Sequence, residues 1–239
     1  RTVVSGITVT GGVNGVIASN RNNLAIRDNI LSGQSSRAID LTNITESLVI
    51  ERNQIGNFGP APAPIGNDAV RLTLTSGTTN VSLLDNALNG FNVAEQGFQV
   101  DVSGTDVVNL LAEDNTSING GNGFRLTTNN TATFNGQFVG NNFNSVAGSG
   151  TARSPMYLRA NDQSVVTLLI EDNTLVSGAG DSPTLWIEAI GVANAAQVTA
   201  IIQNNPAIIN GAGASQGVTL DFAGATRGDI TLRDNPNIV

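Results

Sequence analysis

The side chains of this chain that could do chemistry are its arginines, its carboxylates, one tyrosine and one tryptophan. The chain has 239 residues with no cysteine and no histidine, and its 11 basic residues are all arginines. Disulfides, thiolate metal ligands, histidine or cysteine catalysis and lysine Schiff bases are therefore excluded. Carboxylate, guanidinium, hydroxyl and aromatic groups remain for binding or acid–base work.

The tyrosine and the tryptophan occupy equivalent places in two successive copies of a repeat. Tyr157 lies in the segment MYLR and Trp186 in the segment LWIE. Aromatic rings beside planar polar groups can stack on the apolar faces of sugars, and this predicts a glycan-binding patch. The alternative is an external aromatic stack that only stiffens two neighbouring strands. The candidate glycan-binding residues are Tyr157, Trp186, Arg125, Arg159 and Glu188.

A recurring asparagine marks the repeat that positions these side chains. Segments such as LAIRDNIL, LVIERNQI and VSLLDNAL align on it, and their asparagines follow one another at intervals such as 24 residues from Asn29 to Asn53 and 33 from Asn53 to Asn86. A period near thirty indicates a repeat architecture. The aligned asparagines are Asn29, Asn53, Asn86, Asn115, Asn142, Asn173, Asn205 and Asn235, where Asn142 represents the degenerate copy FVGNNFN.

Each copy contains at least two short strands. Apolar residues five and three positions before the asparagine alternate with polar ones, as Leu24 and Ile26 do, and this period of two is typical of a strand. A second alternating segment, often led by glycine, precedes it, as in GFRL from Gly123. Whether a third short strand completes each copy stays open, because the residues after the asparagine vary too much.

Such short strands bury an apolar face only if equivalent strands of successive copies stack. We therefore predict an all-β fold, a single-stranded right-handed parallel β-helix (β-solenoid) of about eight rungs of roughly 30 residues. The repeat runs through residues 1–239 as one domain. The asparagines would form an inward ladder, because an amide has both a donor and an acceptor and can bond its equivalent one rung away.

Outward residues of the glycine-led strand should form two columns along the solenoid. The first outward column is predicted to contain Ile17, Asp40, Arg71, Gln99, Arg125, Tyr157, Trp186 and Thr219. The second outward column is predicted to contain Ser19, Thr42, Thr73, Asp101, Thr127, Arg159, Glu188 and Asp221.

The glycine, the apolar alternation and the pattern h-x-h-x-x-N-x-h resemble the right-handed parallel β-helix repeats of the pectate-lyase-like superfamily and of bacterial surface and phage proteins. Members of that fold hydrolyse, cleave, bind or extend. The resemblance implies an alternative to a non-catalytic module. In this alternative the chain is an enzyme, a polysaccharide lyase or hydrolase that acts on an acidic polysaccharide. Its catalytic residues would be Arg125 or Arg159 as base, with Asp101, Glu188 or Asp221 near a cation.

A calcium site is a second possibility for the carboxylates. Asp85, Glu113 and Asp114 stack like charges on adjacent rungs, and oxygen ligands at that spacing suit calcium. Solvated turn carboxylates are the alternative, and no other cofactor is expected.

The composition bounds the partners and the location. The net charge of −8 and the pI near 4.3 argue against nucleic acid. With only 13% charged residues the surface must be rich in amides and hydroxyls, which is typical of extracellular proteins. No apolar run is long enough to span a bilayer.

Both ends resemble parts of rungs, so we expect a segment of a longer solenoid or assembly that can self-associate end to end. The function expected is a non-catalytic extracellular module of a bacterial or viral surface: a stalk, filament or adhesin segment that contacts carbohydrate or other surface proteins. The alternatives are the enzyme and a structural subunit of a larger complex.

Overall fold

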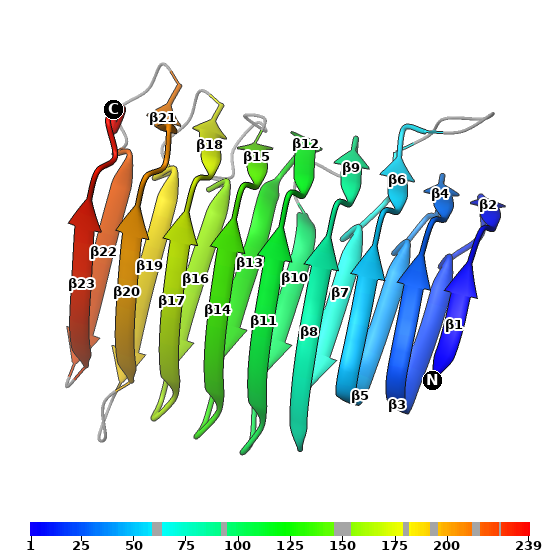
Figure 1. Ribbon diagram of the computed structural model, residues 1–239, viewed down its shortest axis with the longest axis horizontal. Helices are drawn as coiled ribbons and strands as arrows, with labels where there is room; N and C mark the ends of the chain where they lie inside the picture. The colour runs from blue at the N-terminus through cyan, green and yellow to red at the C-terminus, as the bar shows by residue number, and fades with distance from the viewer. Residues whose placement is uncertain are drawn as a thin grey trace.

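The computed structural model describes residues 1–58, 64–91, 95–145, 154–178, 182–191, 196–211, 216–224 and 226–239. Within these ranges the chain forms strands and connections and no helix. Every pairing between strands is parallel, and successive strands of the chain lie in different stacks (Figure 1). The predicted all-β parallel β-solenoid is confirmed. The right-handed winding and the single domain stay predictions.

Each full turn of the solenoid contributes three strands, one to each of three stacks. The third strand, which the sequence left open, is short and follows the ladder asparagine. Stack 1 contains the first halves of β3 (Val16–Arg27) and β5 (Ile39–Glu51), then β7 (Val70–Leu74), β10 (Gln96–Val102), β13 (Asn122–Thr128), β16 (Met156–Asn161), β19 (Leu185–Gly191) and β22 (Val218–Gly224).

Stack 2 continues each of these turns, and stack 3 closes them. Stack 2 contains β1 (Thr2–Ser5), the second halves of β3 and β5, then β8 (Thr78–Leu84), β11 (Val107–Glu113), β14 (Thr133–Val139), β17 (Val165–Glu171), β20 (Gln197–Gln203) and β23 (Arg227–Arg233). Stack 3 contains β2 (Thr8–Thr10), β4 (Ile30–Ser32), β6 (Gln54–Gly56), β9 (Ala87–Asn89), β12 (Thr116–Gly120), β15 (Asn142–Ser145), β18 (Thr174–Ser177) and β21 (Ala207–Asn210).

The predicted number of about eight rungs is too high, and the described residues form about six turns. Turns with three separate strands run from β7 to β21. In β3 and β5 the first two strands are continuous, so stacks 1 and 2 join there into one hydrogen-bonded sheet. The pair β1 and β2 and the pair β22 and β23 are partial turns. The last ladder asparagine, Asn235, follows the partial turn of β22 and β23, so counting every asparagine as one full rung overestimated the number of turns.

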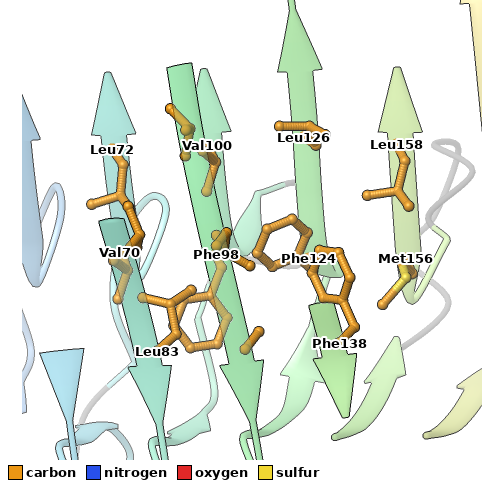
Figure 2. Close-up of a cluster of buried hydrophobic side chains, with 14 of the residues drawn as sticks. Val70, Leu72, Leu83, Phe98, Val100, Phe124, Leu126, Phe138, Met156 and Leu158 are labelled. Atoms are coloured by element: carbon orange, nitrogen blue, oxygen red, sulfur yellow. The ribbon is translucent and has the colours of Figure 1, made fainter. Parts of the chain in front are cut away.

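The core lies between the three stacks and follows from the alternation in the sequence. Inward residues of adjacent turns stack in columns, as Val70, Phe98 and Phe124 do in stack 1 (Figure 2). Phe124 also meets Phe138 of stack 2 edge to face, with ring centroids 4.7 Å apart. Each of these side chains is at most 1% exposed. Burial of such aromatic and aliphatic side chains is the main force that holds the turns together.

The asparagine ladder is present and buried at the corner between stacks 2 and 3. From Asn29 to Asn205, each side-chain amide donates to Oδ1 of the ladder asparagine on the next turn, for example from Asn53 to Asn86 over 3.0 Å. The backbone N–H of Asn53 donates to the same oxygen. In the degenerate copy the ladder residue is Asn141 and not the predicted Asn142, which is exposed. The ladder residues are Asn29, Asn53, Asn86, Asn115, Asn141, Asn173, Asn205 and Asn235.

The residue before each ladder asparagine makes the corner by adopting a positive φ. Asp85 and Asp114 have φ of 52° and 53°, and Gly140 has φ of 67°. Asp, Asn and Gly tolerate this left-handed conformation best. The recurring Asp-Asn pair is thus one corner-forming residue followed by one ladder residue.

Candidate functional site

The outer face of stack 1 places both predicted columns in register. Arg125 pairs with Tyr157, Tyr157 with Trp186, and Trp186 with Thr219, so the first outward column follows one line across successive turns. The second outward column is equally continuous, from Asp101 through Thr127, Arg159 and Glu188 to Asp221. The structure therefore brings the predicted aromatic, cationic and acidic side chains onto one face.

The aromatic pair forms the centre of this face. The rings of Tyr157 and Trp186 have centroids 4.9 Å apart and planes inclined by 41°. On the other side of Tyr157, the Arg125 guanidinium carbon lies 5.7 Å from the ring centroid, within the range of a cation–π contact. Tyr157 is therefore covered on both sides. On its far side Trp186 is next to Thr219 in register, and the side chain of Thr219 is small.

A hydrogen-bonded network in the second outward column fixes the tyrosine. The Tyr157 hydroxyl donates to Glu188, and the Arg159 Nε lies 3.4 Å from Oε2 of the same carboxylate. Arg159 Nε also donates to Asn161 over 2.9 Å, and Asn161 donates to Asn129 over 3.0 Å. Burial and the Glu188 carboxylate raise the pKa of Tyr157 to about 12. The phenol is protonated at neutral pH and serves as a donor.

The five catalytic candidates do not form one constellation. Asp101 accepts from Gln99 over 2.7 Å and lies 3.3 Å from the Arg71 guanidinium. It is three strands away from Glu188, roughly 14 Å. Asp221 is exposed and is next to Glu188 in register. The nearest arginine to Glu188 is held in an ion pair, so its guanidinium is poorly placed to act as a base.

Several donors on this face are buried and lack an acceptor within the described part of the chain. They are Nε of Arg71, Nε of Arg125 and the indole Nε1 of Trp186, all in the first outward column. Buried donors without acceptors are uncommon in proteins. Arg125 also makes no ion pair in the described ranges. The sequence could not reveal these unpaired donors, because they depend on which neighbours reach them.

The sequence also missed two amides, Asn129 and Asn161, that extend the Glu188 network. Asn129 follows β13 directly and Asn161 is the last residue of β16, so both lie at the corner between stacks 1 and 2. Their equivalent places in two successive copies of the repeat could have suggested an amide pair one turn apart.

The calcium candidates lie elsewhere, at the corner between stacks 2 and 3. Asp85, Glu113 and Asp114 lie on adjacent turns, and Asp85 and both residues of the second turn are exposed. In the described ranges no group of three or more acidic residues is arranged to hold a metal ion. On the following turn the column contains Gly140, which leaves room for the Asp114 carboxylate. These carboxylates extend from turns into solvent.

The sequence also predicts that two long loops, residues 56–68 and 144–155, form the walls of any groove beside these columns. Both lie partly outside the described part of the chain, which leaves out residues 59–63 and 146–153.

No helix among the described residues is long and apolar enough to cross a bilayer. Comparisons of this chain with protein-family models, with curated proteins and with solved structures found no match. The resemblance to the pectate-lyase-like superfamily therefore rests on the repeat pattern and stays a prediction, while the parallel β-solenoid is shown by the strand pairing itself.

Proposed function

We propose that this chain is a non-catalytic extracellular β-helix module, a stalk, filament or adhesin segment, and that the outer face of stack 1 contacts carbohydrate. The observation that carries the proposal is Trp186. Its ring is held against Tyr157 on one side and is next to Thr219 in register on the other, and its buried indole N–H has no acceptor among the described residues. A fixed ring whose far side is next to a small side chain suits stacking on a sugar ring.

The surroundings of Trp186 supply polar groups for the hydroxyls of a sugar. Thr219 and Asp221 lie on β22, next to Trp186 and Glu188. Arg125 adds a half-buried cation behind the aromatic pair. The network from Tyr157 through Glu188 to Arg159 lowers the mobility of these side chains before a ligand arrives, which reduces the entropic cost of binding.

The same network favours binding over catalysis. A general acid or base needs a free group with a pKa near the working pH. The Tyr157 pKa of about 12 is far above neutrality, and Arg159 is engaged by Glu188 and Asn161. Because its side chains are already paired with one another, this face is better suited to binding a ligand than to transferring protons.

Titration calorimetry of the whole chain against a panel of cell-surface glycans tests the proposal. We expect binding by the wild type, loss of binding for Trp186→Ala, and an affinity about tenfold lower for Trp186→Phe, which keeps a ring but stacks over a smaller area. Thr174→Ala, on the outer side of stack 3, is the matched control and should bind as the wild type does.

Two outcomes would contradict the proposal. One is binding by Trp186→Ala that equals wild type, or a wild type that binds no glycan of the panel. The other is shortening of an acidic polysaccharide that Arg159→Ala abolishes, which would establish the enzyme alternative. Protease treatment of intact source cells tests the location, because an extracellular module should be cleaved while cytoplasmic proteins stay intact.

A further inference from the structure

Asp106 is a buried carboxyl group that the proposed binding face does not use. It lies in the corner between stacks 1 and 2, directly before β11 (Figure 1). The inward residues of this segment, each at most 3% exposed, are Asp106, Val108, Leu110 and Ala112. The alternation of the strand therefore directs the Asp106 side chain into the core, where the other inward positions are apolar.

Neither carboxyl oxygen of Asp106 has a hydrogen-bond partner among the described residues. Its backbone oxygen accepts from the N–H of Thr133 over 2.9 Å, so the main chain is bonded while the side chain is not. The adjacent N–H of Val107 donates to the backbone oxygen of Gly77 over 2.9 Å. Buried side-chain polar atoms in proteins nearly always have a partner, so this carboxyl group is an exception.

The neighbouring turns show what a polar residue needs at this corner. From β8 to β20 the equivalent positions are Gly77, Asp106, Ala132, Ser164 and Ala196. Ser164 is the other polar residue, and its hydroxyl donates to the backbone oxygen of Asn161 over 2.7 Å and accepts from Thr128 over 2.8 Å. Beside Asp106 the place of Thr128 belongs to Leu74, which has no donor.

Charged side chains of the surrounding strands do not face Asp106. The strands β8 and β14 and the corners at residues 75–77 and 129–132 contain no charged residue. On the other strands the charged residues are outward or exposed, and so is the acidic residue of the corner two turns on. These residues are Arg71 on β7, Asp101 on β10, Glu113 on β11, Arg125 on β13, and Asp162.

The ionised form of Asp106 is therefore costly in the folded chain. Without a donor or an opposite charge, a buried carboxylate costs far more free energy than the neutral acid. Burial raises the pKa of the Asp106 carboxyl above its ordinary value, and the N–H of Val107 lowers it by less. The stability that this group contributes is complete below the pKa of the unfolded chain and is lost as the pH rises through the folded pKa.

We propose that Asp106 is a pH-sensitive element of the solenoid, a carboxyl group that stays protonated in the folded corner and loosens that corner when a rising pH transfers its proton to water. The corner is held to its neighbours by backbone hydrogen bonds from Ser103 to Leu74 and from Thr133 to Asp106, each of 2.9 Å. These bonds are the ones that ionisation should weaken.

Urea unfolding of the whole chain between about pH 4 and pH 8 tests this proposal. Asp106→Ala removes the titrating group and supplies the residue that Ala132 and Ala196 provide on other turns. We expect the urea midpoint of the wild type to shift down relative to that of Asp106→Ala as the pH rises. Asp172→Asn is the matched control, because Asp172 is an exposed corner carboxyl and Asn204 has its place on the next turn. Its midpoint should stay parallel to that of the wild type.

Hydrogen exchange at pH 8 locates the effect. The amides of Ser103 and Thr133 should exchange faster in the wild type than in Asp106→Ala, while the amide of Gln197, which donates to Ser164 in an equivalent corner, should exchange equally in both. Asp106→Asn keeps the test valid if Asp106→Ala fails to fold, because it preserves the shape without titrating. Parallel midpoints of the wild type and the folded variant across this pH range would overturn the proposal, and so would equal exchange at Thr133.

Discussion

Asn115 donates a hydrogen bond from its side-chain amide to Oδ1 of Asn141, over 3.0 Å, and not to the neighbouring Asn142. The reason lies one residue earlier, where Gly140 adopts a φ of 67° and takes the corner position that Asp114 occupies on the turn before. Asn141 therefore points inward and Asn142 begins β15 facing solvent. Two adjacent asparagines in the sequence thus have separate roles.

This assignment predicts very different costs for the two asparagines. Asn141→Ala leaves the backbone and side-chain donors of Asn115 buried without an acceptor, so we expect the free energy of unfolding to fall by about 2–4 kcal/mol. Asn142→Ala changes an exposed side chain and should alter it by less than about 0.5 kcal/mol. Urea unfolding followed by circular dichroism measures both. Equal effects of the two substitutions would contradict the ladder assignment.

A comparison of substitutions at Gly56 and Gly6 distinguishes the cost of a steric clash from the cost of backbone strain. Both have positive φ, 105° and 67°. A Cβ on Gly56 would lie 1.9 Å from the backbone oxygen of Asn89, whereas a Cβ on Gly6 would meet nothing within 4 Å. Gly6→Ala should cost only the left-handed strain, about 1–2 kcal/mol. Gly56→Ala should cost clearly more, because the turn that contains Asn89 has to shift, and thermal unfolding should show a lower midpoint for it than for Gly6→Ala.

The raised pKa of Tyr157 predicts an alkaline transition. The folded pKa of about 12 lies above the ordinary value of 10.0, so the neutral phenol stabilises the folded state below pH 10. This stability is lost as the pH rises from 10 through 12. The chain has a single tyrosine, so phenolate absorbance reports on Tyr157 directly.

Two controls accompany this titration. Burial is the largest cause of the raised pKa of Tyr157 and the Glu188 carboxylate the next, so Glu188→Gln should lower the midpoint while leaving it above 10. The chain unfolded in urea should titrate near 10. A folded wild type with a midpoint near 10 would contradict both the burial of the phenol and its hydrogen bond to Glu188.

The tilted contact between Tyr157 and Trp186 predicts a measurable coupling. In a double-mutant cycle with Ala at each position, we expect the two side chains to couple by about 0.5–1.5 kcal/mol in unfolding free energy. The pair Tyr157 and Thr174, which lie in different stacks, serves as the reference and should give additive effects. A coupling near zero for the aromatic pair would mean that the rings do not stabilise each other.

The two outward columns of stack 1 could be predicted residue by residue from the sequence. Alternation fixes which side chains point outward, and the spacing to the ladder asparagine fixes the register, so the pairing of Arg125 with Tyr157 follows from both. A slip by one residue would bury Arg125 and expose Phe124, which the core forbids. The apolar alternation and the spacing to the ladder asparagine therefore specify the same register.

Other features depend on information that alternation does not contain. The short third strands have few inward residues, such as Leu88 in β9 and Phe143 in β15, and a single apolar residue defines no period. The network around Glu188 depends on how far the side chains of Tyr157 and Arg159 extend across the face, which an alternating pattern does not specify. The choice of Asn141 over Asn142 depends on a corner conformation, and the glycine before Asn141 was the available signal.

The asparagine ladder also has a direction. Both the backbone N–H and the amide of Asn29 donate to Asn53, and the same holds from Asn53 to Asn86 and from Asn86 to Asn115. Each turn thus satisfies the donors of the turn made before it. During synthesis from the N-terminus, each newly made turn supplies the acceptor for the ladder donors of the turn before it. The ladder can therefore assemble in the order in which its turns are translated.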